Sequence, residues 1–270
     1  MKFKGIDVSK WQGNIDFEKV AKAGYNFVII RAGYGSYGID PNFEKNIKKA
    51  IRAGLKVGAY WFLYAKNNYE VAINAQMCDA VLRSYKDDLS LGVWADWEYD
   101  SDKYAKTKFS NHERSLIIKH FCEALKKQDY EVGLYLNPDY IKNKLDMEVL
   151  KGYKLWLAWY TDKEDKALEY KPYIWQYSSE GLIPGITGKV DLNYLYEPEA
   201  QKEEKPKCYG IVTTKGSNLN VRDGAGTKFK QIGKVPNGKE VEILTKDGNW
   251  YKINYKGLVG YISKTYIKEK

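Results

Sequence analysis

The chain has 270 residues and a formal net charge of +9 at pH 7, with 44% hydrophobic and 29% charged residues. This composition supports a packed core and excludes a globally disordered chain, while the length predicts about two domains. No apolar run reaches the ~20 residues that a membrane-spanning helix needs. The three cysteines are far apart and form no CxxC pair, which argues against a disulfide scaffold or zinc knuckle and indicates a reducing compartment.

Short apolar strands alternate with helix-like stretches over residues 1–196. The patterns predict strands at 2–9, 26–33, 56–64, 94–98, 131–137, 153–160, 173–177 and 189–196. They predict helices at 16–23, 41–54 and 113–128, the last one preceded by a Ser110–Glu113 capping box. About eight strands alternating with helices favour an α/β fold of the (β/α) barrel kind, and a doubly wound open sheet is the alternative.

Residues 197–207, EPEAQKEEKPK, contain two prolines and no large apolar residue, which predicts a flexible charged linker. The pattern of residues 208–270 then changes to all-β. Gly, Asn and Asp turns separate predicted strands at 210–214, 219–222, 230–235, 240–246, 250–255 and 257–263. We therefore expect a small all-β barrel after the linker.

The positive charge is concentrated in this tail. Residues 208–270 have a net charge of +7, and the preceding 207 residues have a net charge of only +2. This distribution disfavours nucleic-acid binding by the whole chain and favours a basic module that binds an acidic surface.

The most informative short motif is the triplet Asp96-Trp97-Glu98 on a predicted strand. Alternate residues of a strand share a face, so both carboxyl groups are expected to point the same way. Such a pair is costly for structure alone but suits glycoside hydrolysis, in which one acid stays protonated and the other ionised. Asp7 and Asp191 also lie near predicted strand ends, which converge on one face of a barrel. The plainer interpretation is that these acids are solvated or cap turns.

Several segments, in chain order, resemble glycoside hydrolase family 25, the Chalaropsis-type lysozymes. They are GIDVSKWQG, FVIIRAGYG, GAYWF, DWE, LYLN, LWLAWY and IWQYSSEGLIPGITGKVDLNYLY, and the resemblance covers residues 3–196. It implies an irregular, TIM-like (β/α) barrel over residues 1–196. It also implies cleavage of the β-1,4 bond between N-acetylmuramic acid and N-acetylglucosamine, whose stereochemical outcome the spacing leaves open.

The resemblance also implies roles for individual residues. Glu98 would be the general acid, Asp96 would stabilise the reacting centre, and Asp7 and Asp191 would tune that pair. The residues implied to contact sugar are Tyr60, Tyr135, Tyr160 and Gln176. Trp61 and Trp159 depart from the common family pattern, and both departures are expected to alter sugar contacts but not the acids.

The segments LNVRDGAGT and W…GYIS in the tail resemble bacterial SH3-like wall-binding modules. The resemblance implies that residues 208–270 bind peptidoglycan, and the positive charge suggests anionic wall polymers as further ligands. The expected binding surface includes Asn220, Arg222, Trp250 and Tyr261. For Trp250, a place in the small hydrophobic core is the stronger alternative.

Other functions find less support in the sequence. Gly33-x-Gly35-x-x-Gly38 follows a predicted strand, but the next strand does not end in the acid that a dinucleotide site requires. We therefore expect no cofactor, no metal, no nucleic-acid partner and no membrane insertion. The absence of an N-terminal signal segment resembles phage endolysins, which are made in the host cytoplasm and reach the wall through a holin lesion. A bacterial autolysin, or a non-catalytic wall-binding protein on a decayed hydrolase barrel, remains an alternative.

Overall fold

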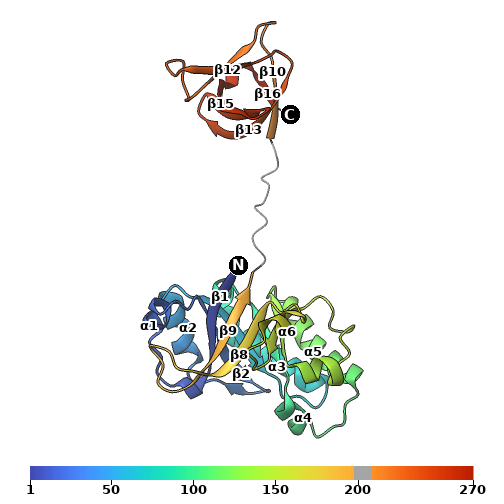
Figure 1. Cartoon of the computed structure of the whole chain (residues 1–270). Coiled ribbons are helices and arrows are strands. Elements are labelled where there is room, and N and C mark those ends of the chain that lie inside the picture. Colours follow the sequence, from blue (N-terminus) through green and yellow to red (C-terminus); the bar gives the residue numbers. More distant parts are fainter. Residues whose placement is uncertain (198–207, 270) are drawn as a thin grey trace. The chain divides into compact units, whose positions relative to one another are not determined.

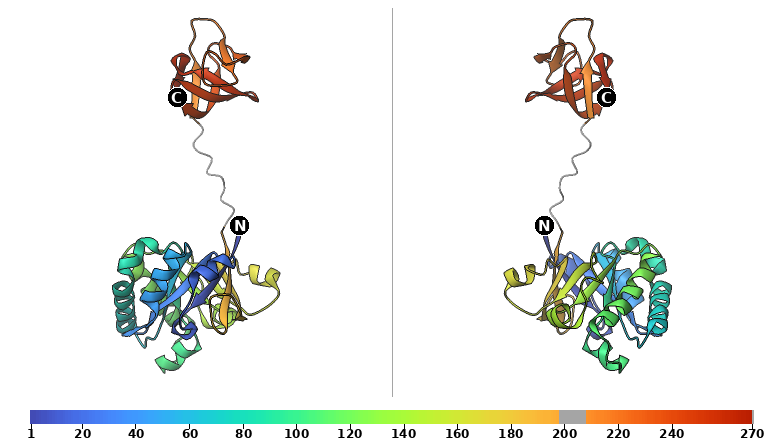
Figure 2. Two further views of the ribbon diagram at one scale, coloured as in Figure 1. Left: turned by 90° about the vertical axis from the view of Figure 1, so that its left-hand side faces the viewer. Right: turned by 90° about the vertical axis from the view of Figure 1, so that its right-hand side faces the viewer.

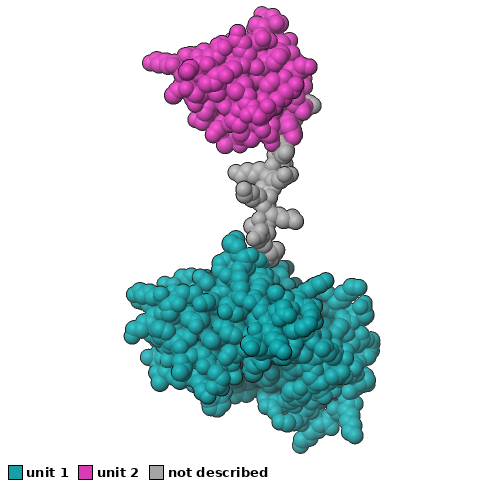
Figure 3. All heavy atoms as spheres, in the orientation of Figure 1, with its two compact units in different colours: residues 1–199 teal, residues 200–270 magenta. Residues whose placement is uncertain are grey.

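The computed structural model describes residues 1–197 and 208–269. The chain forms two compact units, residues 1–199 and residues 200–270 (Figures 1 and 3). Apart from Glu197, the predicted linker at 197–207 lies outside the described residues.

The first unit is a closed barrel, because β1 pairs with both β2 and β9 at the two sides of the sheet. The strand order β1-β9-β8-β7-β6-β5-β4-β2 forms the ring, and β3 is added beside β2. Its strands are β1 (Lys2–Val8), β2 (Phe27–Tyr34), β3 (Gly38–Ile39), β4 (Lys56–Phe62), β5 (Val93–Asp96), β6 (Val132–Leu136), β7 (Lys154–Ala158), β8 (Ile174–Gly181) and β9 (Val190–Tyr196). The ring confirms the predicted irregular (β/α) barrel and excludes the open sheet. Its irregularity is β9, which runs antiparallel to both neighbours.

Helices cover the outside of this ring (Figures 1 and 2). They are α1 (Phe17–Lys22), α2 (Phe43–Arg52), α3 (Asn68–Leu82), α4 (Tyr99–Ala105), α5 (Asn111–Lys126) and α6 (Glu164–Leu168), with shorter turns η1 (Lys10–Gln12), η2 (Arg83–Asp88) and η3 (Tyr140–Lys144). The Ser110–Glu113 capping box before α5 is confirmed. The predicted start of α2 at Pro41 is wrong, because Asn42 is its N-cap and the Asp40 side chain accepts a hydrogen bond from the Asn42 amide.

The barrel has an aromatic interior and an aliphatic outer layer. Trp94, Tyr135 and Trp156 fill the interior, and Tyr60 packs against them. The neighbouring Trp61 points outward and is fully buried, with its indole N–H donated to the Gly35 carbonyl. The expectation that Trp61 alters sugar contacts is therefore wrong, because strand alternation places its ring on the helix side of the sheet.

The second unit is an all-antiparallel small barrel, as predicted. Its strands are β10 (Cys208–Val212), β11 (Leu219–Arg222), β12 (Gln231–Val235), β13 (Glu240–Asp247), β14 (Trp250–Tyr255), β15 (Leu258–Ser263) and β16 (Ile267–Glu269), with a short turn η4 (Lys264–Tyr266). Val212, Val221, Ile253 and Ile262 are fully buried in its core. The sequence pattern missed only β16, which pairs with β10. In the described parts of both units, no helix has the length and apolar character to cross a membrane.

Candidate active site

Four acidic residues meet at the carboxyl ends of the parallel strands. Asp7 lies near the end of β1, Asp96 is the last residue of β5, and Glu98 follows two residues later. Asp191 lies at the start of β9, which is antiparallel, so it stands directly opposite Asp7. The reversed strand therefore brings a fourth carboxyl group to the end of the barrel where the parallel strands finish.

Asp7 is buried and held by two amide side chains. Its Oδ2 accepts hydrogen bonds from Gln176 Nε2 and from Asn193 Nδ2, each at 2.8 Å. Burial and the nearby charge of Asp191 raise the pKa of Asp7 well above its ordinary value, and these two hydrogen bonds oppose the shift. The amides therefore limit the cost of a carboxyl group that would otherwise be isolated inside the protein.

Ring side chains fix these two amides in turn. Tyr135 and Tyr160 donate their hydroxyl groups to Gln176 Oε1 at 2.8 and 3.1 Å. The Trp156 indole N–H donates to Asn193 Oδ1 at 2.8 Å. Since each amide oxygen has a donor, each NH₂ group is oriented toward Asp7.

Asp96 is 4% exposed, and its Oδ1 is buried with no hydrogen-bond partner among the described residues. Burial, then the charges of Glu98 and Asp7, raise the pKa of Asp96 well above its ordinary value, while Arg31 opposes the shift. A buried polar atom without a partner is rare in native proteins, and a catalytic role is one explanation for it.

Glu98 is the N-cap residue of α4. Its backbone N–H donates to Ser101 Oγ at 3.1 Å, and its carbonyl accepts from the Ser101 amide at 2.9 Å. Burial, Asp100 and Asp191 raise the pKa of Glu98 to about 7, and burial raises that of Asp191 to about 6. Between these values the site can hold a protonated Glu98 beside an ionised Asp191.

The residues expected to contact sugar differ in solvent exposure and in hydrogen bonding. Tyr160 is 57% exposed, whereas Tyr135 is buried and Tyr60 is half-buried against Trp156. Gln176 is only 3% exposed and already engaged by Asp7 and the two tyrosines. Its observed contacts are therefore those of a residue that orients Asp7.

Sequence reasoning missed two parts of this site. Asn193 follows Asp191 by two residues on β9, so strand alternation could have placed both on the inner face. For Trp156, the sequence showed only its place in an apolar strand and gave no sign of a role in the site.

Trp159 is the other departure from the family pattern. Its half-buried ring packs against Tyr170 at a centroid distance of 5.7 Å.

The second unit carries a groove of about 830 Å³. Asn220, Arg222 and Trp250 line it, whereas Tyr261 is not among its lining residues and pairs with Arg222 across β11 and β15. Threonine, serine, lysine and tyrosine residues, with Asn218 and Leu219, complete the lining. The half-buried Trp250 lines the groove and is absent from the described hydrophobic core of this unit, so the alternative of a core position is not confirmed.

Across residues 1–197 and 208–269, no group of three or more His, Cys, Asp or Glu side chains could hold a metal ion. Cys78 and Cys122 are buried free cysteines, and burial raises the pKa of both thiols.

Comparison with known families gives two matches. Residues 6–186 match the family model of glycosyl hydrolases family 25, and residues 217–268 match that of the bacterial SH3 domain. The first match covers more than half of the chain, and it includes Asp7, Asp96 and Glu98.

Individual relatives agree with these matches. The chain is 28% identical over 195 residues to the autolytic lysozyme of Clostridium acetobutylicum, a match that covers 72% of this chain and 56% of that protein. A family 25 glycosyl hydrolase from Bacillus anthracis superposes with a TM-score of 0.61 at 26% identity, covering 74% of this chain and 92% of that structure. The modular autolysin LytC of Streptococcus pneumoniae superposes with the same TM-score at 29% identity, covering 72% and 47%. The chain therefore matches only about half the length of two of these relatives.

Proposed function

The chain belongs to glycosyl hydrolase family 25, and from this premise we propose that it is a peptidoglycan hydrolase. We propose specifically an N-acetylmuramidase, which cleaves the β-1,4 bond between N-acetylmuramic acid and N-acetylglucosamine. The observation that carries the proposal is Glu98, a carboxyl group whose pKa is raised to about 7 beside three other acids at the carboxyl ends of the barrel strands.

Glu98 acts as the general acid in this proposal. A glycosidic bond breaks when its oxygen receives a proton and the sugar carbon left behind gains positive charge. The raised pKa lets Glu98 hold that proton near neutral pH and transfer it to the leaving oxygen. Water then adds to the sugar carbon and gives up a proton, so the products are two chain ends, one of them newly reducing.

Asp96 stabilises the positive charge at the reacting carbon or orients the substrate's acetamido group. Its Oδ1 is buried with no hydrogen-bond partner within the described residues, so in this proposal the side chain turns before this oxygen accepts a donor from the substrate. Asp191 adds negative charge near Glu98, and its own pKa is raised to about 6, so it is ionised while Glu98 is still largely protonated. Asp7 completes the cluster and connects it to the amides of Gln176 and Asn193.

Aromatic residues around the acids are suited to sugar rings, which present apolar faces and polar edges. Tyr160 is the most exposed of those that the sequence suggested, and its hydroxyl group is tied to the site through Gln176. The rings of Tyr60 and Tyr135 both pack against Trp156.

We assign the catalytic role to residues 1–196 and wall binding to residues 208–270. Peptidoglycan is the proposed partner of both, and the groove lined by Asn220, Arg222 and Trp250 is the proposed binding surface of the tail. The net positive charge of residues 208–270 also suits anionic wall polymers. Joining two binding units raises the effective concentration of the enzyme at an insoluble polymer, which fits an endolysin-like enzyme that acts on the bacterial cell wall.

The test measures the release of reducing sugar from purified peptidoglycan by the full chain. We expect activity from the wild type and from Glu18→Gln, an exposed control on α1, and a loss of at least about 100-fold from Glu98→Gln. Undiminished activity of Glu98→Gln would remove the assignment of the acid. No release from several wall types by the wild type, with binding retained, would instead favour the non-catalytic wall-binding protein.

A further inference from the structure

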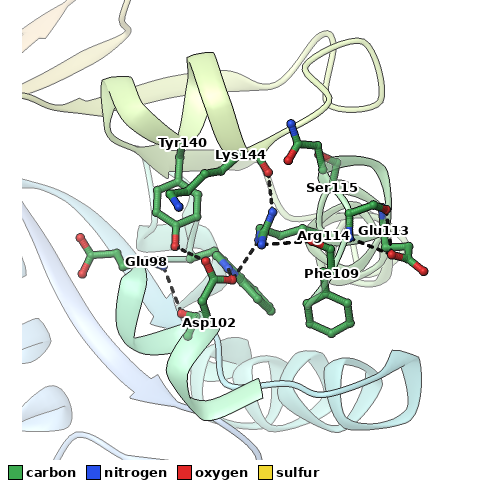
Figure 4. Close-up of polar contacts among 12 residues, drawn as sticks. Glu98, Asp102, Phe109, Glu113, Arg114, Ser115, Tyr140 and Lys144 are labelled. Atoms are coloured by element: carbon green, nitrogen blue, oxygen red, sulfur yellow. Dashed lines mark hydrogen bonds and ion pairs between the residues drawn. The ribbon is translucent and has the colours of Figure 1, made fainter. Parts of the chain in front are cut away.

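A second polar cluster lies around α4, the short helix that begins after the proposed acid. At its centre is Asp102, one turn after Glu98 on the same short helix. Figure 4 shows the Glu98 side chain pointing away from this cluster, while Asp102 and Arg114 point toward each other. The two carboxyl groups therefore point in different directions, because Glu98 is the extended N-cap residue whereas Asp102 lies within the helix.

Asp102 receives donors from three elements. Its Oδ1 accepts from Arg114 Nε at 2.9 Å and from the Trp97 indole N–H at 3.1 Å, and its Oδ2 accepts from the Tyr140 hydroxyl at 2.6 Å. Trp97 and Tyr140 are at most 1% exposed. This carboxylate therefore joins the strand end, α5 and η3 to the helix that begins at Glu98.

Arg114 extends the same cluster. Its Nη1 donates to the Lys144 carbonyl at 2.6 Å, and its Nη2 donates to the Phe109 carbonyl at 3.4 Å. The side chain is 10% exposed and reaches three separate segments (Figure 4). A planar guanidinium group can make these contacts together because its donors diverge in a fixed fork.

The helix that these contacts hold cannot be stable by itself. α4 has seven residues, and isolated helices shorter than about 12–15 residues are marginal in water. Trp97 stands between Asp96 and Glu98 in the chain, so a fixed indole also fixes the backbone that joins the two acids. Its ring packs against Phe109 at a centroid distance of 6.2 Å.

We propose that Asp102 and Arg114 are positioning residues that hold α4, and with it Glu98, at the carboxyl end of the barrel. This inference rests on the proposed function, in which Glu98 donates the proton. Neither residue touches the substrate in this proposal. They act through Trp97 and the first turn of α4, so their loss lets Glu98 move and admits water around its carboxyl group.

Two consequences follow for the variants Asp102→Asn and Arg114→Met. A misplaced acid lowers kcat, by about 100-fold for a displacement of about 1 Å, while KM changes little. Greater hydration of Glu98 lowers its pKa from about 7 by about one pH unit, because burial is the largest cause of its present value. Other titratable groups also interact electrostatically with Glu98. They are Asp7, Asp96, Asp100, Asp191, Tyr64, Tyr99, Tyr135 and Tyr160.

The two variants separate positioning from a simple charge effect. Removing the cation of Arg114 would by itself raise the pKa of Glu98, whereas removing the anion of Asp102 would lower it. Loosening of α4 lowers the pKa in both variants. Arg83→Met is the matched control, because it removes a guanidinium group from the exposed ion pair between Arg83 and Asp79.

The experiment uses the full chain with ¹³C-labelled glutamate, and the Glu98 signal is assigned by comparison with Glu98→Gln. NMR titration gives the pKa of Glu98, initial rates on soluble uncross-linked glycan strands give kcat and KM, and circular dichroism gives the melting temperature. We expect both variants to lower the pKa of Glu98 and kcat, with Arg114→Lys intermediate and Arg83→Met unchanged. Arg114→Lys keeps the test decisive if Arg114→Met does not fold, because it alters the contacts of the guanidinium group while it keeps the positive charge.

Two results would overturn the inference. One is a lower melting temperature with the pKa of Glu98 and kcat both unchanged, which would make the cluster merely structural. The other is a higher pKa of Glu98 in Arg114→Met, which would indicate charge alone. Full activity of Glu98→Gln would instead overturn the proposed function, and the titration of Glu98 would still report whether the cluster positions it.

Discussion

Replacing Glu98 by glutamine is predicted to stabilise the protein while it removes activity. Burial and the charges of Asp100 and Asp191 raise the pKa of Glu98 from 4.5 to about 7. Because the pKa is higher in the folded state, protonation of Glu98 favours folding. This stabilisation is fully present below about pH 4.5 and is lost as the pH rises through about 7. At about 1.4 kcal/mol per pH unit, the ionised group costs the folded state about 3 kcal/mol at pH 8.

The glutamine variant avoids this cost, because it carries no charge at any pH. We expect wild type and Glu98→Gln to unfold with similar free energies at pH 4.5, and the variant to be about 3 kcal/mol more stable at pH 8. For a unit of about 200 residues this corresponds to a melting temperature higher by roughly 6–12 °C.

Urea unfolding of the full chain at both pH values, followed by tryptophan fluorescence, measures this difference. Seven of the eight tryptophans lie in residues 1–197 and only Trp250 lies in the tail, so the signal reports mainly on the barrel. The exposed Glu18→Gln should show no such pH-dependent gain. A difference between Glu98→Gln and wild type that is the same at both pH values, or a less stable variant at pH 8, would refute the reasoning.

Four further predictions concern the pH dependence of activity, the Asn193 amide, the Trp250 side chain and the tail as a whole. Activity on soluble glycan strands should fall as the pH rises through about 7, because Glu98 loses its proton there; a rate that keeps rising to pH 9 would contradict this. Asn193→Ala should lower the free energy of unfolding by about 1–3 kcal/mol in urea titrations. The change removes a hydrogen bond to buried Asp7 and leaves the Trp156 indole without its acceptor. An unchanged free energy of unfolding would show that the amide does not stabilise Asp7. Trp250→Ala should weaken binding to insoluble peptidoglycan in a pull-down without changing kcat on soluble strands; unchanged binding would move the wall-binding surface elsewhere. Residues 1–196 alone should keep the bond specificity but lyse cells more slowly than the full chain; equal lysis rates at physiological salt would remove the targeting role of the tail.

The sequence predicted the gathering of the acids because strand ends leave a readable pattern. Asp7, Asp96 and Glu98 each lie at or just beyond the end of an apolar run, and parallel strands bring such ends together. Asp191 reaches the same place from the start of its strand, since β9 is antiparallel. The apolar pattern could not reveal that reversal, because it contains no strand direction.

Other elements were missed because their stability comes from distant partners. α4 has the sequence YDSDKYA, which shows no apolar face, and its anchor Asp102 depends on Arg114 and Tyr140, 12 and 38 residues further along the chain. In α3, Asn74 occupies a fully buried position and interrupts the apolar stripe. Its amide instead donates to the Glu70 carbonyl of the same helix and to the Tyr64 carbonyl, and only the folded loop supplies the second acceptor.

The most direct test of the account is mass spectrometry, after borohydride reduction, of fragments released from purified peptidoglycan by the full chain and by Glu98→Gln. We predict new reducing ends on N-acetylmuramic acid with the wild type and none with the variant. New reducing ends on N-acetylglucosamine would contradict the assigned bond, and fragments released equally by Glu98→Gln would contradict the role of Glu98.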